Sequence, residues 1–138
     1  MPAPYNIFIS YSHNDHDRPL LRELRNHLAP LVNKGRIRVW DDTDSLAGDE
    51  WMQQIEGELA TADCVLLLAS SNYNASKFIN DTELPLILER HSVGKCRVVP
   101  ILLRPFYFKL TDYAHFEFLP KNPDNEELTP VDSWTQQD

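Results

Sequence analysis

The sequence predicts a single α/β domain built on a parallel sheet of four to five strands flanked by helices. Short apolar runs rich in β-branched residues alternate with segments of helical periodicity along the 138 residues. The apolar runs are continuous rather than alternating, which is typical of parallel strands buried on both faces. The links are short, as in repeated strand–helix–strand units. A hydrophobic content of 42% and a length of 138 residues suffice for one packed core.

The first strand is predicted at Asn6–Tyr11, an apolar run with β-branched and aromatic residues. Asp17 is the candidate N-cap of the first helix, Pro19 fits its first turn, and Gly35 ends it. The apolar stripe of this helix recurs at helical spacing and comprises Leu20, Leu21, Leu24, Leu28, Leu31 and Val32. Arg36–Trp40 is the predicted second strand.

The middle of the chain repeats the same alternation. Asp42–Asp49 is a loop rich in turn-forming residues, and an amphipathic helix follows it on the spacing of Trp51, Ile55 and Leu59. Cys64–Ala69 is a continuous apolar run, as expected of a central parallel strand.

Two further strands are predicted after the third helix. The fourth covers Arg97–Leu103, and Pro100 within it indicates a bulge or a partly unpaired edge. A short fifth strand is predicted near Phe116–Leu119.

Glu83 lies on the third helix, which follows the polar turn Ser70–Ser76. Pro85 cannot donate a hydrogen bond to the carbonyl of Asp81, so the helix is predicted to kink or break there. Most helical glutamates are solvated, but a carboxylate beside a distorted turn with aromatic and aliphatic neighbours can be held at a cleft.

Composition excludes several classes of function. The net charge of −8 argues against nucleic acid, and the sequence has no Lys/Arg run suited to an anionic membrane. The amino-terminal residues lack the pattern of a signal peptide, and no apolar run is long enough to span a bilayer. Cys64 and Cys96 lie in apolar runs without ligand spacing, as expected of reduced thiols in a cytoplasmic protein.

Missing motifs narrow the chemistry further. No glycine lies in the loop directly after the first predicted strand. A dinucleotide-cofactor fingerprint and a phosphate-binding loop are therefore both absent. No serine lies in a GxSxG elbow. The ends of the first and third predicted strands, Ser10–Ser12 and Ala69–Ser71, lack the carboxylates that a phosphoacceptor receiver domain needs there. The cluster His13, Asp15, His16 and Asp17 is spaced too loosely for a metal site, and none is expected.

Ligands of parallel α/β sheets bind at the carboxyl ends of the strands, near the switch in strand order. Those ends carry Ser10–His13, Trp40–Asp44 and Ala69–Asn72. The acidic residues here, Asp41, Asp42 and Asp44, can equally well cap the loop and the following helix.

Five blocks in order, FISYS, VWDDTDSLAGDEW, CVLLLAS, ASKFINDTELP and VVPILLRP, resemble a bacterial Toll/interleukin receptor (TIR) domain over roughly residues 6–134. The resemblance implies the flavodoxin-like TIR fold. It also implies an NAD+ glycohydrolase (an NAD+ nucleosidase) of bacterial antiphage defence, active on self-assembly, with NAD+ as substrate and no cofactor. Members of this kind are often fused to a sensor. The chain is therefore expected to be an effector domain that stops before its last helix and lacks that sensor.

By this resemblance Glu83 is the catalytic carboxylate. Many active members carry an aromatic residue four positions before it. Here that position is Ile79, and Phe78, one residue earlier, is expected to supply the aromatic surface. The substrate-binding residues implied are Ser10, Tyr11, Ser12, His13, Asp44, Trp51, Phe78 and Ile79. Asp44 lies in the BB loop between strand two and helix two, and Trp51 follows that loop.

One carboxylate is enough for this reaction. The nicotinamide of NAD+ is already a cation, so it leaves as a neutral ring and needs no general acid. The remaining task is to stabilise the oxocarbenium-like ribosyl centre and to hold the ribose, which one glutamate can do in a site drier than bulk water. The rival hypothesis is a non-catalytic adaptor whose loops Asp42–Asp49 and Ser70–Ser76 mediate TIR–TIR contacts.

Overall fold

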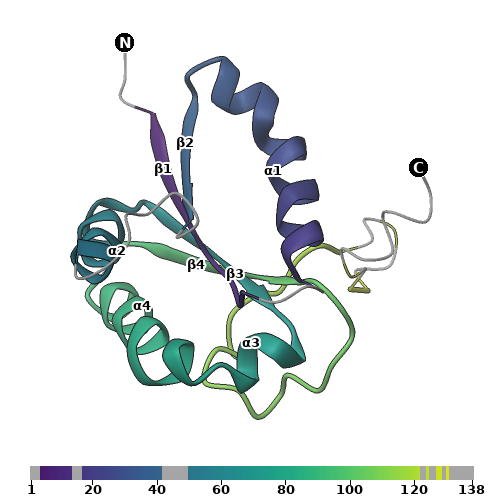
Figure 1. The fold of residues 1–138 in the computed structure, drawn as a ribbon. Coiled ribbons are helices and arrows are strands. Elements are labelled where there is room, and N and C mark those ends of the chain that lie inside the picture. Colours follow the sequence, from purple (N-terminus) through teal and green to yellow (C-terminus); the bar gives the residue numbers. More distant parts are fainter. Residues whose placement is uncertain are drawn as a thin grey trace.

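The computed structural model describes residues 4–13, 17–41, 50–121, 124, 127, 128 and 130, with the side chains of Glu50 and Trp51 left aside. Its centre is a four-stranded parallel sheet in the order β2-β1-β3-β4 (Figure 1). The strands are β1 (Tyr5–Ser10), β2 (Ile37–Asp41), β3 (Cys64–Ala69) and β4 (Arg97–Leu102). The strand order reverses direction between β1 and β3, so a ligand site is expected at the carboxyl ends of these two strands.

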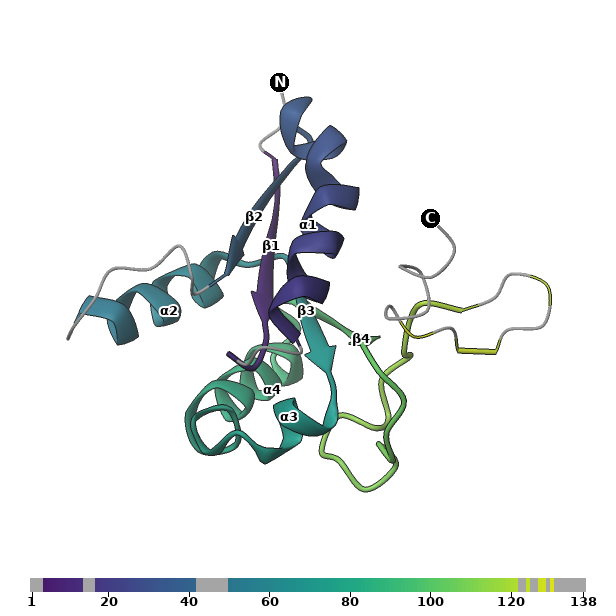
Figure 2. The same cartoon turned by 45° about the vertical axis from the view of Figure 1, so that its right-hand side comes forward.

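Helices cover both faces of the sheet, as predicted. Helix α1 (Asp17–Asn33) lies on one face, and α2 (Glu50–Thr61) and α4 (Leu84–Ser92) lie on the other, as Figures 1 and 2 both show. A short helix α3 (Ser71–Ala75) and a π-helical turn η2 (Ile79–Glu83) connect β3 to α4. No helix in the described part of the chain is long and apolar enough to cross a bilayer.

Each face of the sheet has its own apolar cluster, because successive side chains of a buried strand point to opposite faces. On the α1 face, Ile9 and Leu68 pack against Leu20, Leu21 and Leu24. On the other face, Phe8 and Leu67 pack with the residues of α2 and α4, namely Ile55, Leu59, Leu84 and Ile87. This double burial fixes the ends of β1 and β3 and therefore the position of the loops that follow them.

Three expectations are corrected at the edges of the elements. Ser70–Ser76 is not a turn throughout, because the Ser70 hydroxyl accepts a hydrogen bond from the Tyr73 N–H and caps α3. Leu31 and Val32 are 41% and 42% exposed, so the last turn of α1 does not pack on the core. Near Phe116–Leu119 the described chain forms a single bridge, from Leu119 to Ile101, rather than a fifth strand.

Pro100 confirms the prediction of an edge strand, because β4 lies at the end of the sheet. Its carbonyl accepts a hydrogen bond from the Leu119 N–H, and Leu102 donates to the Leu119 carbonyl. The segment after β4 therefore covers part of this edge.

Candidate active site at the carboxyl ends of β1 and β3

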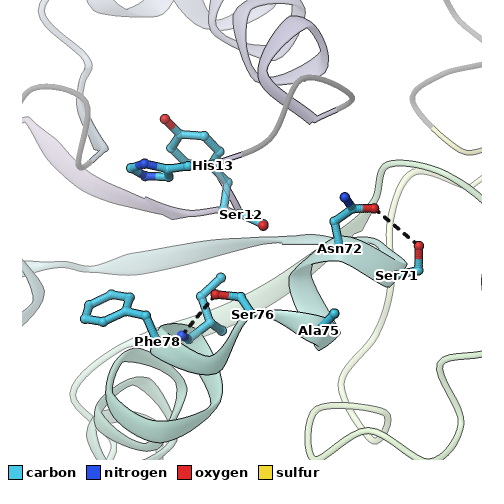
Figure 3. A pocket seen from close by; sticks show the side chains of 9 residues that line it. Ser12, His13, Ser71, Asn72, Ala75, Ser76 and Phe78 are labelled. Carbon is cyan, nitrogen blue, oxygen red and sulfur yellow. Dashed lines mark hydrogen bonds between the residues drawn. The ribbon is translucent and has the colours of Figure 1, made fainter.

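A pocket of about 660 Å³ opens where β1 and β3 end (Figure 3). One side is formed by the residues after β1, and the other by α3 and the residues leading into the π turn. The lining residues are Tyr11, Ser12, His13, Ser71, Asn72, Ala75, Ser76, Phe78 and Ile79. The pocket thus lies at the switch in strand order, where the ligand site is predicted from the sequence.

Aromatic side chains from two segments face this pocket. The rings of Tyr11 and His13 stack with their centroids 4.7 Å apart and an interplanar angle of 23°. Phe78 lines the pocket from the other segment, across the opening from His13 (Figure 3). Flat rings with few polar atoms suit an aromatic ligand group such as a nucleobase or a pyridine ring.

Three buried polar side chains, Ser10, Tyr73 and Glu83, lie on segments that also carry residues of the pocket lining. Ser10 and Tyr73 are fully buried and Glu83 is 2% exposed. The hydroxyl oxygens of Ser10 and Tyr73 are 2.9 Å apart and share a hydrogen bond. Burial raises the pKa of Tyr73 well above its usual value, and the charge of Glu83 raises it further, against the opposing effect of the Ser10 hydrogen bond. Tyr73 is therefore a neutral phenol close enough to Glu83 to feel its charge.

The predicted break near Glu83 is confirmed, and it takes the form of a π-helical turn. The Leu84 N–H donates to the carbonyl of Ile79, five residues earlier, and Pro85 lies in the first turn of α4. Residues five apart in a π turn take the relation that residues four apart have in an α-helix. In this π turn, Phe78, five positions before Glu83, therefore takes the place relative to Glu83 that an aromatic residue four positions before it would have in an α-helix.

A buried ionic cluster, absent from the sequence prediction, joins the segments that surround the pocket. The carboxylate of Asp17 is fully buried and accepts hydrogen bonds from the Ser70 hydroxyl at 2.6 Å and from Arg104 at 3.0 Å. The same nitrogen of Arg104 donates to the side-chain oxygen of Asn72 at 2.7 Å, and Asn72 lines the pocket. Asp17 begins α1, whereas Ser70 and Arg104 follow β3 and β4. The hydrogen bonds of this cluster therefore join the start of α1 to the segments after these two strands.

The structure brings together most of the predicted site residues. Tyr11, Ser12, His13, Phe78 and Ile79 line the pocket, whereas Ser10 lies buried beside it and bonds Tyr73. Glu83 is buried and is not among the described residues that line the pocket. Asp44 and the side chain of Trp51 lie outside the described part of the structure. Asp15 and His16, of the cluster for which no metal site is expected, also lie outside it.

The sequence prediction does not include Tyr73 or the Asp17–Arg104 pair, and it names Asn72 only as part of the strand end Ala69–Asn72, with no role of its own. The sequence predicts Asp17 as a helix cap, and its burial becomes evident only from its hydrogen bonds to Ser70 and Arg104, 53 and 87 positions away. The available signals were Ser70 and Arg104, polar residues that directly follow apolar strands.

Comparison with known proteins decides the family. The profile of the TIR domain matches residues 7–134. The chain belongs to the TIR domain family. It is 33% identical over 129 residues to the uncharacterized protein y4lF of Sinorhizobium fredii, covering 94% of this chain and 38% of that protein. This TIR domain thus spans well under half the length of that relative.

A solved structure supports the same fold. The TIR domains of the activated Roq1 resistosome, which directly recognises the pathogen effector XopQ, match with a TM-score of 0.58 and 26% identity. The match covers 70% of this chain and 56% of the Roq1 chain. The four-stranded parallel sheet flanked by helices is therefore the TIR fold.

Proposed function

We propose that this TIR domain cleaves the N-glycosidic bond between the ribose and nicotinamide of NAD+, with Glu83 as the catalytic carboxylate. The observation that carries the proposal is a buried carboxyl group at the end of a π turn whose first residue, Ile79, lines a 660 Å³ pocket together with Phe78 just before it. Buried carboxyl groups are uncommon, and π turns occur frequently at functional sites.

The chemistry needs little more than this carboxylate. The bond from the ribose anomeric carbon to the pyridinium nitrogen breaks, and its electron pair neutralises the departing nicotinamide. Glu83 would stabilise the positive charge that develops on the ribose, a type of stabilisation typically worth a factor of about 10²–10³ in rate. Water then adds to the anomeric carbon and releases a proton to give ADP-ribose, or an adenine nitrogen adds to give a cyclic product.

The pocket residues have matching roles in this proposal. The Tyr11–His13 stack and Phe78 offer flat surfaces for the nicotinamide ring. Asn72 and Ser76 offer hydrogen-bonding groups for the carboxamide and the ribose hydroxyls.

Self-association would supply the active state. Glu83 is only 2% exposed in the single chain, so the ribose can reach it only after the pocket opens toward the π turn. Contacts between copies that favour the open arrangement would raise its population. We infer that the isolated domain is weakly active, and that in the cell it acts in the cytoplasm as the effector part of a longer antiphage defence protein.

The second candidate is a non-catalytic adaptor that acts through TIR–TIR contacts. The burial of Glu83 favours it, since an adaptor needs no exposed carboxylate. The two functions are separated by following nicotinamide release from NAD+ over a wide dilution series and on copies tethered to a multivalent scaffold. NAD+ cleavage predicts release per molecule that rises with concentration and tethering. The adaptor predicts self-association without release under any of these conditions.

A further inference from the structure

A second pocket, of about 340 Å³, lies on the α1 side of the sheet. Its lining residues are Tyr11, Arg18, Leu21, Arg22, Arg25 and Asp41. Tyr11 follows β1 and Asp41 ends β2, so this pocket also lies at the carboxyl ends of the strands.

The second pocket is rich in positive charge although the chain as a whole carries −8. Arg25 pairs with the buried carboxylate of Asp41, which neutralises one cation. Arg18 and Arg22 are exposed, and neither has an ion-pair partner in the part of the chain that the structure describes. They are four residues apart on α1 and therefore face the same side and repel each other. An anion bound between them would relieve this repulsion.

The chemistry of arginine indicates which anion fits. A guanidinium presents a planar fork of N–H donors that matches the oxygens of a phosphate, and two such groups can hold the two phosphates of a diphosphate. Leu21 and Tyr11, both buried, form the inner wall of this pocket behind the two exposed arginines.

Tyr11 lines both pockets, so one side chain borders the two cavities. A ligand with an aromatic ring at one end and phosphates further along could occupy both. We propose that Arg18 and Arg22 bind the diphosphate of the dinucleotide whose nicotinamide end occupies the first pocket. This inference rests on the proposed function, and it assigns a diphosphate subsite to the α1 face.

Calorimetric binding to the full chain tests this assignment without requiring turnover. The probes are NAD+, inorganic pyrophosphate and nicotinamide riboside, which carries no phosphate. The test variant is Arg18→Ala with Arg22→Ala, and the control is Arg36→Ala, an exposed arginine at the opposite end of the strands. To prevent cleavage, all proteins also carry Glu83→Gln.

The expected result is a loss of at least about tenfold in affinity for NAD+ and pyrophosphate in the double variant, with nicotinamide riboside binding unchanged and the Arg36 variant unaffected. The salt dependence of NAD+ binding should weaken in parallel, because fewer phosphate contacts remain.

Equal NAD+ affinity in the double variant and the Arg36 control would overturn the proposal. Binding of pyrophosphate but not NAD+ would overturn the dinucleotide assignment and indicate a site for a free phosphate compound. A defect in self-association with NAD+ affinity unchanged would also overturn it and indicate a protein contact. None of these outcomes depends on nicotinamide release, so failure of the proposed activity remains separate.

Discussion

Replacing Arg104 by methionine should lower the free energy of unfolding by about 3 kcal/mol. The substitution keeps an apolar stem but removes the guanidinium that contacts Asp17 at 3.0 Å and Asn72 at 2.7 Å. Removing one member of a buried ion pair costs roughly 3–5 kcal/mol. The Asp17 side chain is fully buried, but that of Arg104 is 27% exposed, which places the cost at the lower end of this range.

Urea unfolding followed by circular dichroism measures this effect. With an m-value of about 2 kcal/mol per molar urea, the midpoint should fall by about 1.5 M. Arg36→Met, at an exposed arginine, is the matched control and should leave the midpoint unchanged within about 0.3 M. Combining Arg104→Met with Asp17→Asn should cost less than the sum of the two single changes, because the pair is coupled. A midpoint for Arg104→Met equal to that of the control would refute the reasoning.

Two further perturbations test the surroundings of the pocket, and a third tests the buried start of β3. Tyr73→Phe should cost about 1–3 kcal/mol in free energy of unfolding, because the buried Ser10 hydroxyl loses its partner; a cost under about 0.3 kcal/mol in urea unfolding would contradict this. Deleting Asp81 should convert the π turn into an α-helix and abolish nicotinamide release, whereas Asp81→Ala should change the rate less than about twofold; equal rates would argue against the turn. Burial raises the pKa of Cys64 to about 11, above that of the unfolded thiol, so the stability it contributes is present below about pH 9 and is lost between pH 9 and 11. Cys64→Ala should flatten that part of the pH–stability curve, and an unchanged slope would contradict the assignment.

The order of elements could be predicted from the sequence because it depends on local periodicity. Cys64–Ala69 is apolar throughout, and this alone indicated the central strand that the structure contains. Pro85 likewise indicated a break in the third helix, since it lacks an N–H wherever it stands. The site followed from the rule that loops after parallel strands meet at one edge of the sheet.

The remaining features depend on contacts between distant segments, which periodicity does not encode. The local sequence indicates only a helix cap at Asp17, and its burial follows from the approach of Ser70 and Arg104. Pro85 predicts only a break, because the loss of one N–H does not specify that the Leu84 N–H will bond the carbonyl of Ile79 in a π turn. The sequence allows Glu83 to be either solvated or held beside the distorted turn, and only the packed structure shows that it is buried.

The most direct test of the account compares nicotinamide release from NAD+ by wild-type and Glu83→Gln protein, both tethered at the same density. Glu89→Gln, an exposed position on α4, is the matched control. The account predicts that Glu83→Gln releases nicotinamide at least about 100-fold more slowly than wild type and than the Glu89 control. Equal release by the wild type and the Glu83 variant would contradict it.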